Sequence, residues 1–153
     1  MLETQARRLN RSRLLHSKVL EPCLALEPLS LKEKHLAKLR AGDWIDLGEH
    51  LPRLQIRRAG RRVAEVRCEG SECFVSRLCD GEAEIPERKR VLVESRIAVV
   101  PESEVREGGR LELPDPVLEQ ILLFVGEEPL AIARLVRGGN GHYALEIRER
   151  IDG

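Results

Sequence analysis

Residues 42–78 read GDWIDLGEHLPRLQIRRAGRRVAEVRCEGSECFVSRL, and residues 108–147 read GGRLELPDPVLEQILLFVGEEPLAIARLVRGGNGHYALEI. The two stretches match when aligned, at an offset that drifts from 66 to 69 residues. The matched residues are Ile45-Asp46-Leu47 with Leu111-Glu112-Leu113, Val63-Ala64 with Leu130-Ala131, Phe74 with Tyr143, and Leu78 with Ile147. A period of this length is too long for a solenoid repeat and is typical of a small domain. The sequence therefore predicts two copies of one unit.

Each unit is predicted to be mainly β, because short apolar runs alternate with glycine-containing turns. The first unit is expected to have an edge strand over 18–26, interrupted by Pro22, and a helix over 31–40 that begins with a capping box at Ser30 and Glu33. Its further strands are expected over 44–47, 54–58, 63–68 and 73–78. The second unit is expected to have strands over 91–100, 110–113, 119–125, 130–136 and 142–148, with a short helix over 102–107.

The expected organisation is a basic tail over 1–17, the first unit over 18–79, a linker over 80–90 and the second unit over 91–151. Units this small bury little apolar surface alone. We therefore expect the fold to be two tandem β-barrel units, with a small α component, packed as a pseudo-twofold intramolecular dimer. The apolar run 121–125 does not alternate, so both of its faces should be covered. The residues expected to pack between the units are Trp44, Ile45, Leu122, Leu123, Phe124 and Val125.

The composition is that of a globular chain: 153 residues, 42% hydrophobic and 34% charged, with only 3% aromatic residues. The 26 basic and 26 acidic residues give a formal net charge of zero, which removes a general attraction to nucleic acid or anionic membranes. The apolar stretches are too short to span a bilayer, and the N-terminus lacks the apolar core of a secretory signal. We therefore expect a cytoplasmic protein whose four cysteines (Cys23, Cys68, Cys73 and Cys79) are reduced and mostly buried.

Catalytic and metal-binding patterns are missing from the sequence. The cysteines lack the paired spacing of zinc sites, and the four histidines (His16, His35, His50 and His142) lack the spacing of a metal-binding helix. The run Gly138–Gly141 lies between two predicted strands, so it is expected to form a hairpin turn and not a phosphate-binding loop. We expect no enzymatic activity, no cofactor and no bound metal.

The order of these elements resembles the SpoA (surface presentation of antigens) domain, over roughly 18–79 and 90–151. The residues that carry the resemblance are Leu36, Leu39, Gly42, Asp43, Ile45 and Leu47 in the first copy, and Gly109, Leu111, Leu113, Leu123, Val125, Leu130, Ala131, Ala133, Tyr143, Leu145 and Ile147 in the second. Two SpoA domains in one chain are the arrangement of the cytoplasmic-ring, or sorting-platform, protein of type III secretion systems. Flagellar motor-switch proteins carry one copy each, and a flagellar C-ring component is the alternative. The chain departs from the secretion protein in having only about 18 residues ahead of the first copy, where that family has a sizeable domain.

The resemblance implies a non-catalytic adaptor that docks the stalk protein of the secretion ATPase and other copies of the ring protein, including a longer form. It places the partner-binding patch at Leu135, Val136 and Arg137, although strand alternation would turn one of the first two residues inward. A less favoured alternative is a small barrel that binds nucleic acid through the arginines of the hairpin between Arg53 and Arg67. Few aromatic residues are available to stack on bases, and we expect Trp44 to lie in the core.

Overall fold

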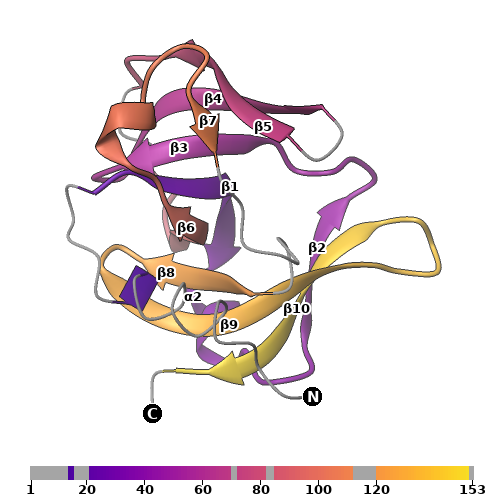
Figure 1. Cartoon of the computed structure of the whole chain (residues 1–153). Helices are drawn as coiled ribbons and strands as arrows, with labels where there is room; N and C mark the ends of the chain where they lie inside the picture. The colour runs from indigo at the N-terminus through magenta and orange to yellow at the C-terminus, as the bar shows by residue number, and fades with distance from the viewer. Residues whose placement is uncertain (1–13, 16–20, 70–71, 82–84, 112–119, 152–153) are drawn as a thin grey trace.

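The computed structural model describes residues 14–15, 21–69, 72–81, 85–111 and 120–151 (Figure 1). Over these ranges the protein is mainly β, as predicted, with ten strands in one antiparallel sheet. The strands are β1 (Cys23–Lys32), β2 (Trp44–Gly48), β3 (Leu54–Arg58), β4 (Arg61–Glu69), β5 (Glu72–Leu78), β6 (Arg90–Val99), β7 (Arg110–Leu111), β8 (Ile121–Val125), β9 (Glu128–Arg137) and β10 (Tyr143–Arg150). The helical elements with described bounds are α2 (Glu33–Ala37) and the 3-10 turn η1 (Glu102–Glu104), and residues 14–15 are also helical.

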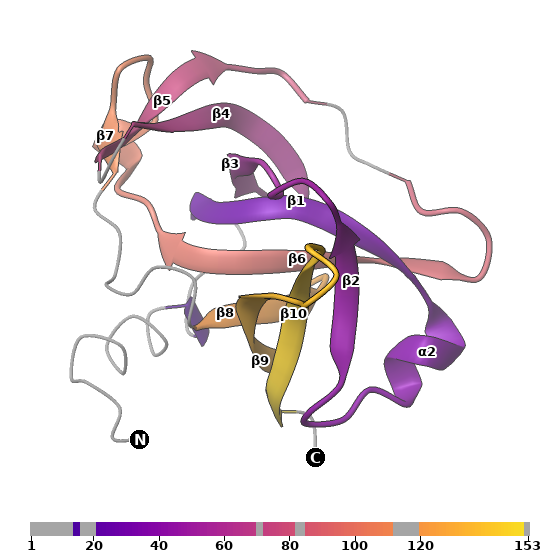
Figure 2. The same ribbon diagram turned by 90° about the vertical axis from the view of Figure 1, so that its right-hand side faces the viewer.

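The sheet order is β2-β10-β9-β8-β6-β1-β3-β4-β5-β7, so the two halves of the chain are joined at three pairs of strands. At the centre, β1 and β6 run antiparallel from the Cys23–Val99 pair to the Lys32–Arg90 pair. Near one edge β2 leaves the first half and pairs with β10 (Figure 2), and near the other β7 pairs with β5. The counterparts in the two halves are β1 and β6, β2 and β7, β3 and β8, β4 and β9, and β5 and β10. When each strand is exchanged for its counterpart, the order is the same read from the opposite edge.

The main core lies on one face of the curved sheet, because alternate side chains of each strand point to the same side. Ile56 and Ala64 are paired neighbours in the first half, and Leu123 and Ala131 are paired neighbours in the second; all four are buried. Leu123 follows Ile56 by 67 residues, and Ala131 follows Ala64 by the same number. The repeat that is visible in the sequence is therefore also a repeat of core positions.

Two local predictions for the first unit are wrong. The first strand is central and not an edge strand, and it begins after Pro22, so that the missing N–H of proline is not needed in the ladder. The predicted capping box at Ser30 does not form: Ser30 lies within β1, opposite Leu92 of β6, and α2 begins only at Glu33 with no side-chain cap. Pairing with β6 extends the strand through the residues that local pattern assigns to the helix.

The expectation that all four cysteines are reduced is also wrong. Cys68 of β4 and Cys73 of β5 lie directly opposite each other and form a disulfide, while Cys23 and Cys79 are free. Cys68 is exposed, so it is not the buried hydrophobe that the sequence suggested. The closed loop spans a sequence separation of only five residues, so in the chain-entropy model the bond contributes about 2 kcal/mol.

A second, smaller apolar cluster lies on the opposite face of the central strands. It contains Cys23, Leu122, Phe124 and Ile132, and Leu14 is fully buried against it. The unbroken apolar run of β8 is explained by this arrangement, since Ile121 and Leu123 face the main core while Leu122 and Phe124 face the second cluster. The tail around Leu14, residues 1–13 and 16–20, lies outside the described residues, as do 70–71, 82–84 and 112–119 of the predicted turn, linker and strands.

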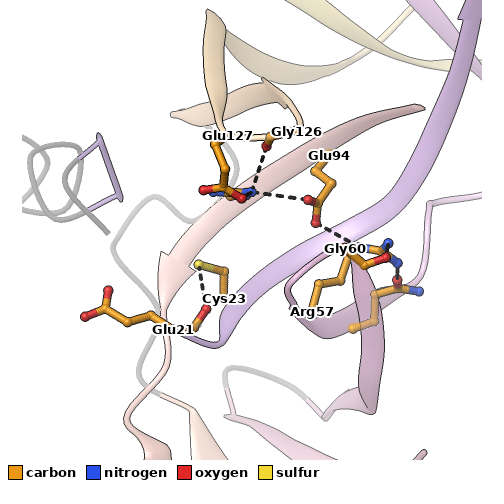
Figure 3. Close-up of polar contacts among 9 residues, drawn as sticks. Glu21, Cys23, Arg57, Gly60, Glu94, Gly126 and Glu127 are labelled. Carbon is orange, nitrogen blue, oxygen red and sulfur yellow. Dashed lines mark hydrogen bonds and ion pairs between the residues drawn. The ribbon is translucent and has the colours of Figure 1, made fainter. Parts of the chain in front are cut away.

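Beside this second cluster, the same face carries a buried ionic network that connects the two halves (Figure 3). Arg57 of β3 donates from Nε to Glu94 of β6 (2.9 Å), from Nη1 to the side chain of Gln55 (2.7 Å) and from Nη2 to the carbonyl of Gly60 (3.0 Å). Arg96 donates to the other oxygen of Glu94 (3.2 Å), and its guanidinium lies 4.0 Å from the ring centre of Phe124. One carboxylate therefore serves two buried arginines, which is a charge-assisted arrangement that holds β3 and β6 together.

Candidate protein-binding surface

The predicted patch on β9 has its residues on different sides of the sheet. Leu135 is opposite Leu145 and packs against the main core, whereas Val136 is opposite Ala144 and faces the outer side. Arg137, at the end of β9, is exposed, and its guanidinium lies 5.4 Å from the ring centre of Tyr143. Val136 and Arg137 are therefore both accessible without disturbing the core, but from opposite sides of the sheet.

A row of polar contacts crosses the same outer face from β9 through β10 to β2. Arg134 donates from Nε to Glu146 Oε1 (2.7 Å), and the indole Nε1 of Trp44 donates to Glu146 Oε2 (3.1 Å). Trp44 is 52% exposed, so its predicted core position is wrong. Since β2 is an edge strand whose Ile45 faces the core, alternation turns Trp44 outward. Trp44 nevertheless contacts the second half of the chain, through Glu146.

The hairpin between β9 and β10 borders an open hollow on this face. The hollow has a volume of about 320 Å³ and is lined by Trp44, Asp46, Gly138, Gly139, Asn140, His142 and Ala144. His142 Nδ1 lies 3.2 Å from Asp46 Oδ1, and its Nε2 lies 3.8 Å from Glu49 Oε1. We call the outer face formed by Val136, Trp44 and this hollow the β9–β2 surface. It combines an exposed indole and a half-buried valine with charged groups at the rim, a composition typical of protein interfaces.

The pKa of Glu146 is held below its ordinary value of 4.5 by the hydrogen bond from Arg134 and by that from Trp44. The charged carboxylate of Glu146 is therefore the form that accepts these two hydrogen bonds. They are present above the ordinary pKa and are lost as the pH falls through the lower pKa of the folded state. Because Trp44 is the only tryptophan, its fluorescence should change in an acid titration with a midpoint below 4.5. The Glu146→Gln variant should lose this transition. A midpoint above 4.5, or an unchanged transition in that variant, would contradict the assignment.

The other residues predicted to pack between the units lie in three environments. Ile45 is buried in the main core and pairs with Leu145, so it does join the two halves. Leu123 is in the same core, whereas Leu122 and Phe124 belong to the cluster around Leu14. Val125 is partly buried at the end of β8.

The arginine-rich hairpin between β3 and β4 is largely neutralised. Arg57 is buried in its ionic network, Arg58 pairs with Glu102, and Arg62 lies 3.9 Å from Glu65. Arg53 lies 4.0 Å from Glu27. Arg61 and Arg67 are the two arginines of this hairpin for which no ion pair is found within the described ranges. The geometry therefore does not favour phosphate neutralisation at this hairpin.

Within the described part of the chain, no group of three or more histidine, cysteine, aspartate or glutamate side chains is arranged to hold a metal ion. None of its helices has the length and apolar character needed to cross a membrane. Comparison with protein-family models gives no match, and comparison with curated proteins gives none either.

The sequence missed the role of Glu146 and the outward position of Trp44. The outward direction of Glu146 could have been predicted, because it lies between two apolar residues, Leu145 and Ile147, in a run that alternates. Its partners could not be identified in the same way, since Arg134 and Trp44 reach it only through the pairing of β10 with β9 and β2.

Proposed function

We propose that this protein is a non-catalytic adaptor of the cytoplasmic ring, or sorting platform, of a type III secretion apparatus, with two tandem SpoA-like barrel units packed as a pseudo-twofold pair. Its partners would be the stalk protein that links the ring to the secretion ATPase and other copies of the ring protein. The site of action would be cytoplasmic and peripheral to the inner-membrane apparatus. A flagellar C-ring role, with the same surface and the same kind of partner, is the nearest alternative.

The observation that carries this proposal is the palindromic strand order. Three strand pairs, β1–β6, β2–β10 and β5–β7, connect the halves, so that neither half has a complete sheet of its own. Such mutual completion builds one rigid body from two copies of a unit that is too small to bury a core alone. A rigid sheet with two related but different outer faces is suited to holding partners at fixed positions.

The difference between the two outer faces points to the second half as the partner-binding half. In the first half, β4 and β5 carry the ion pair of Glu65 with Arg77 (2.8 Å) on the outer face. The second half carries the corresponding ion pair, Arg134 with Glu146 (2.7 Å), and the β9–β2 surface presents Val136 and the indole of Trp44 in addition. Buried aromatic side chains with surrounding apolar contacts contribute most to binding energy in protein interfaces, whereas exposed ion pairs contribute little.

The proposal is tested by purifying the chain together with the candidate ATPase-stalk protein. The mass of any complex is then measured by light scattering. We expect a defined complex whose affinity falls by about tenfold or more in Val136→Asp, because an interfacial valine is replaced by a desolvated charge. Leu135→Asp is not a useful variant, since Leu135 packs against the core.

Leu78→Asp provides the matched control, because Leu78 is 46% exposed on β5 of the first half, away from the β9–β2 surface. It should leave the complex intact, and both variants should keep the circular dichroism spectrum of the parent chain. Failure of the stalk protein to bind, or equal weakening by both variants, would count against the adaptor role at this surface.

A further inference from the structure

A second surface gathers positive charge where β1 ends and β6 begins, at one end of the two central strands. It is a hollow of about 470 Å³ lined by Lys32, Glu33, Lys34, Arg88, Lys89 and Arg90. Five of these six side chains are cationic, on a chain whose formal net charge is zero. We call this surface the basic hollow.

The fold brings these cations together from both halves of the chain. Lys32 at the end of β1 lies directly opposite Arg90 at the start of β6. The backbone N–H of Glu33 donates to the carbonyl of Lys89 (3.1 Å), which joins the start of α2 to the turn before β6. Like charges directly opposite each other on neighbouring strands are destabilising. Their juxtaposition here is imposed by the central strand pairing.

The cations of the basic hollow are not neutralised within the described residues. None of the five forms an ion pair there, and Arg90 instead donates from Nη1 to the carbonyl of Ser30 (2.9 Å). Lys89 has a φ of 64°, a left-handed conformation that is uncommon for residues other than glycine. Uncompensated like charges and an unfavourable backbone conformation at one place point to a function that requires them.

We propose that the basic hollow binds an acidic segment of a partner protein, whose carboxylates neutralise the five cations. Nucleic acid is the other polyanion to consider, but binding of single strands relies on aromatic side chains that stack on the bases. The chain has one tryptophan, one tyrosine and two phenylalanines, and none of them lines the hollow. The lining cations are exposed, apart from the half-buried Arg90, which suits an extended peptide held by several charge contacts.

This proposal does not depend on the secretion-apparatus assignment, because it rests only on charge and geometry. The test measures fluorescence anisotropy with two labelled probes: a peptide of about twelve residues, mostly glutamate and aspartate, and a dT oligonucleotide of similar charge. The peptide is expected to bind at low salt and to dissociate as salt is added, since exposed charge contacts are screened. Lys34→Glu combined with Arg88→Glu should weaken peptide binding by about tenfold or more.

Arg61→Glu combined with Arg67→Glu is the matched control, since these exposed arginines of β4 also lack an ion pair within the described residues and do not line the basic hollow. This control should bind the peptide nearly as well as the parent chain. Both double variants should retain the parent circular dichroism spectrum, and Lys34→Gln with Arg88→Gln should show the same loss in a milder form. No peptide binding at low salt, equal losses in both double variants, or tighter binding of the oligonucleotide would overturn the proposal.

Discussion

Replacing Glu94 by glutamine is expected to destabilise the protein by about 3–5 kcal/mol, because two buried arginines then lose the carboxylate that they share, although Arg96 keeps a longer contact with Glu127 (3.7 Å). The side chain of Arg57 is 3% exposed and that of Arg96 is 9% exposed, so solvent cannot replace the missing charge. Glutamine has nearly the same shape as glutamate, so the loss would report the charge and not a cavity. Chemical unfolding in urea, monitored by circular dichroism, measures the change.

An exposed ion pair provides the control for Glu94. Glu65 accepts a hydrogen bond from Arg77 on the outer face of β4 and β5, where both side chains are substantially exposed. Glu65→Gln should therefore change the free energy of unfolding by less than about 1 kcal/mol. If the Glu94 variant also stayed within about 1 kcal/mol of the parent chain, the network would not be a significant connection between the halves.

Truncating Leu123 to alanine is expected to cost about 2–5 kcal/mol, through lost apolar burial and the cavity left behind. Leu123 is fully buried in β8, opposite Ser95 of β6 and Ala131 of β9. Its neighbours are backbone-paired strands at the middle of the sheet, which cannot collapse readily into the space. The same urea unfolding experiment gives the magnitude, and the midpoint of thermal unfolding should fall by roughly 2–4 °C for each kcal/mol lost.

Leu78→Ala makes the identical chemical change at a position that is 46% exposed. It is expected to cost at most about 1 kcal/mol, since much of that side chain is already in water. A similar cost for the two substitutions would mean that Leu123 does not lie in a close-packed core, and would contradict the placement of β8 at the middle of the sheet.

The strand positions in both halves could be predicted from the sequence, because side-chain alternation is a local property. The runs that became β3, β4, β8, β9 and β10 alternate or are unbroken and apolar, and each was predicted within a few residues of its observed bounds. Apart from the Cys68–Cys73 disulfide, whose cysteines are only five residues apart, the wrong predictions concern residues whose environment depends on a distant partner. Ser30 has a good local signal for capping a helix, but the ladder with β6 satisfies its backbone instead.

In the candidate site too, some positions follow from the local sequence pattern and others only from the pairing of distant strands. Val136 was included from the resemblance, and its outward direction follows from alternation once Leu135 is known to face inward. The exposure of Trp44 could not be predicted, because its strand might have been central or at an edge with the same local pattern. The basic hollow was visible only in part: Arg88, Lys89 and Arg90 are adjacent in the sequence, whereas Lys32 and Lys34 lie more than fifty residues away.

By itself, the sequence determined that this protein is mainly β, that its two halves repeat one pattern of core residues, and that no obvious catalytic motif is present. Only the tertiary structure decided which strands pair across the halves, which arginines are buried, and where free positive charge gathers. The physical reason is the range of the interactions. Alternation and turn chemistry act over a few neighbouring residues, whereas strand pairing and charge pairing depend on residues that the chain brings together only when both halves complete one sheet.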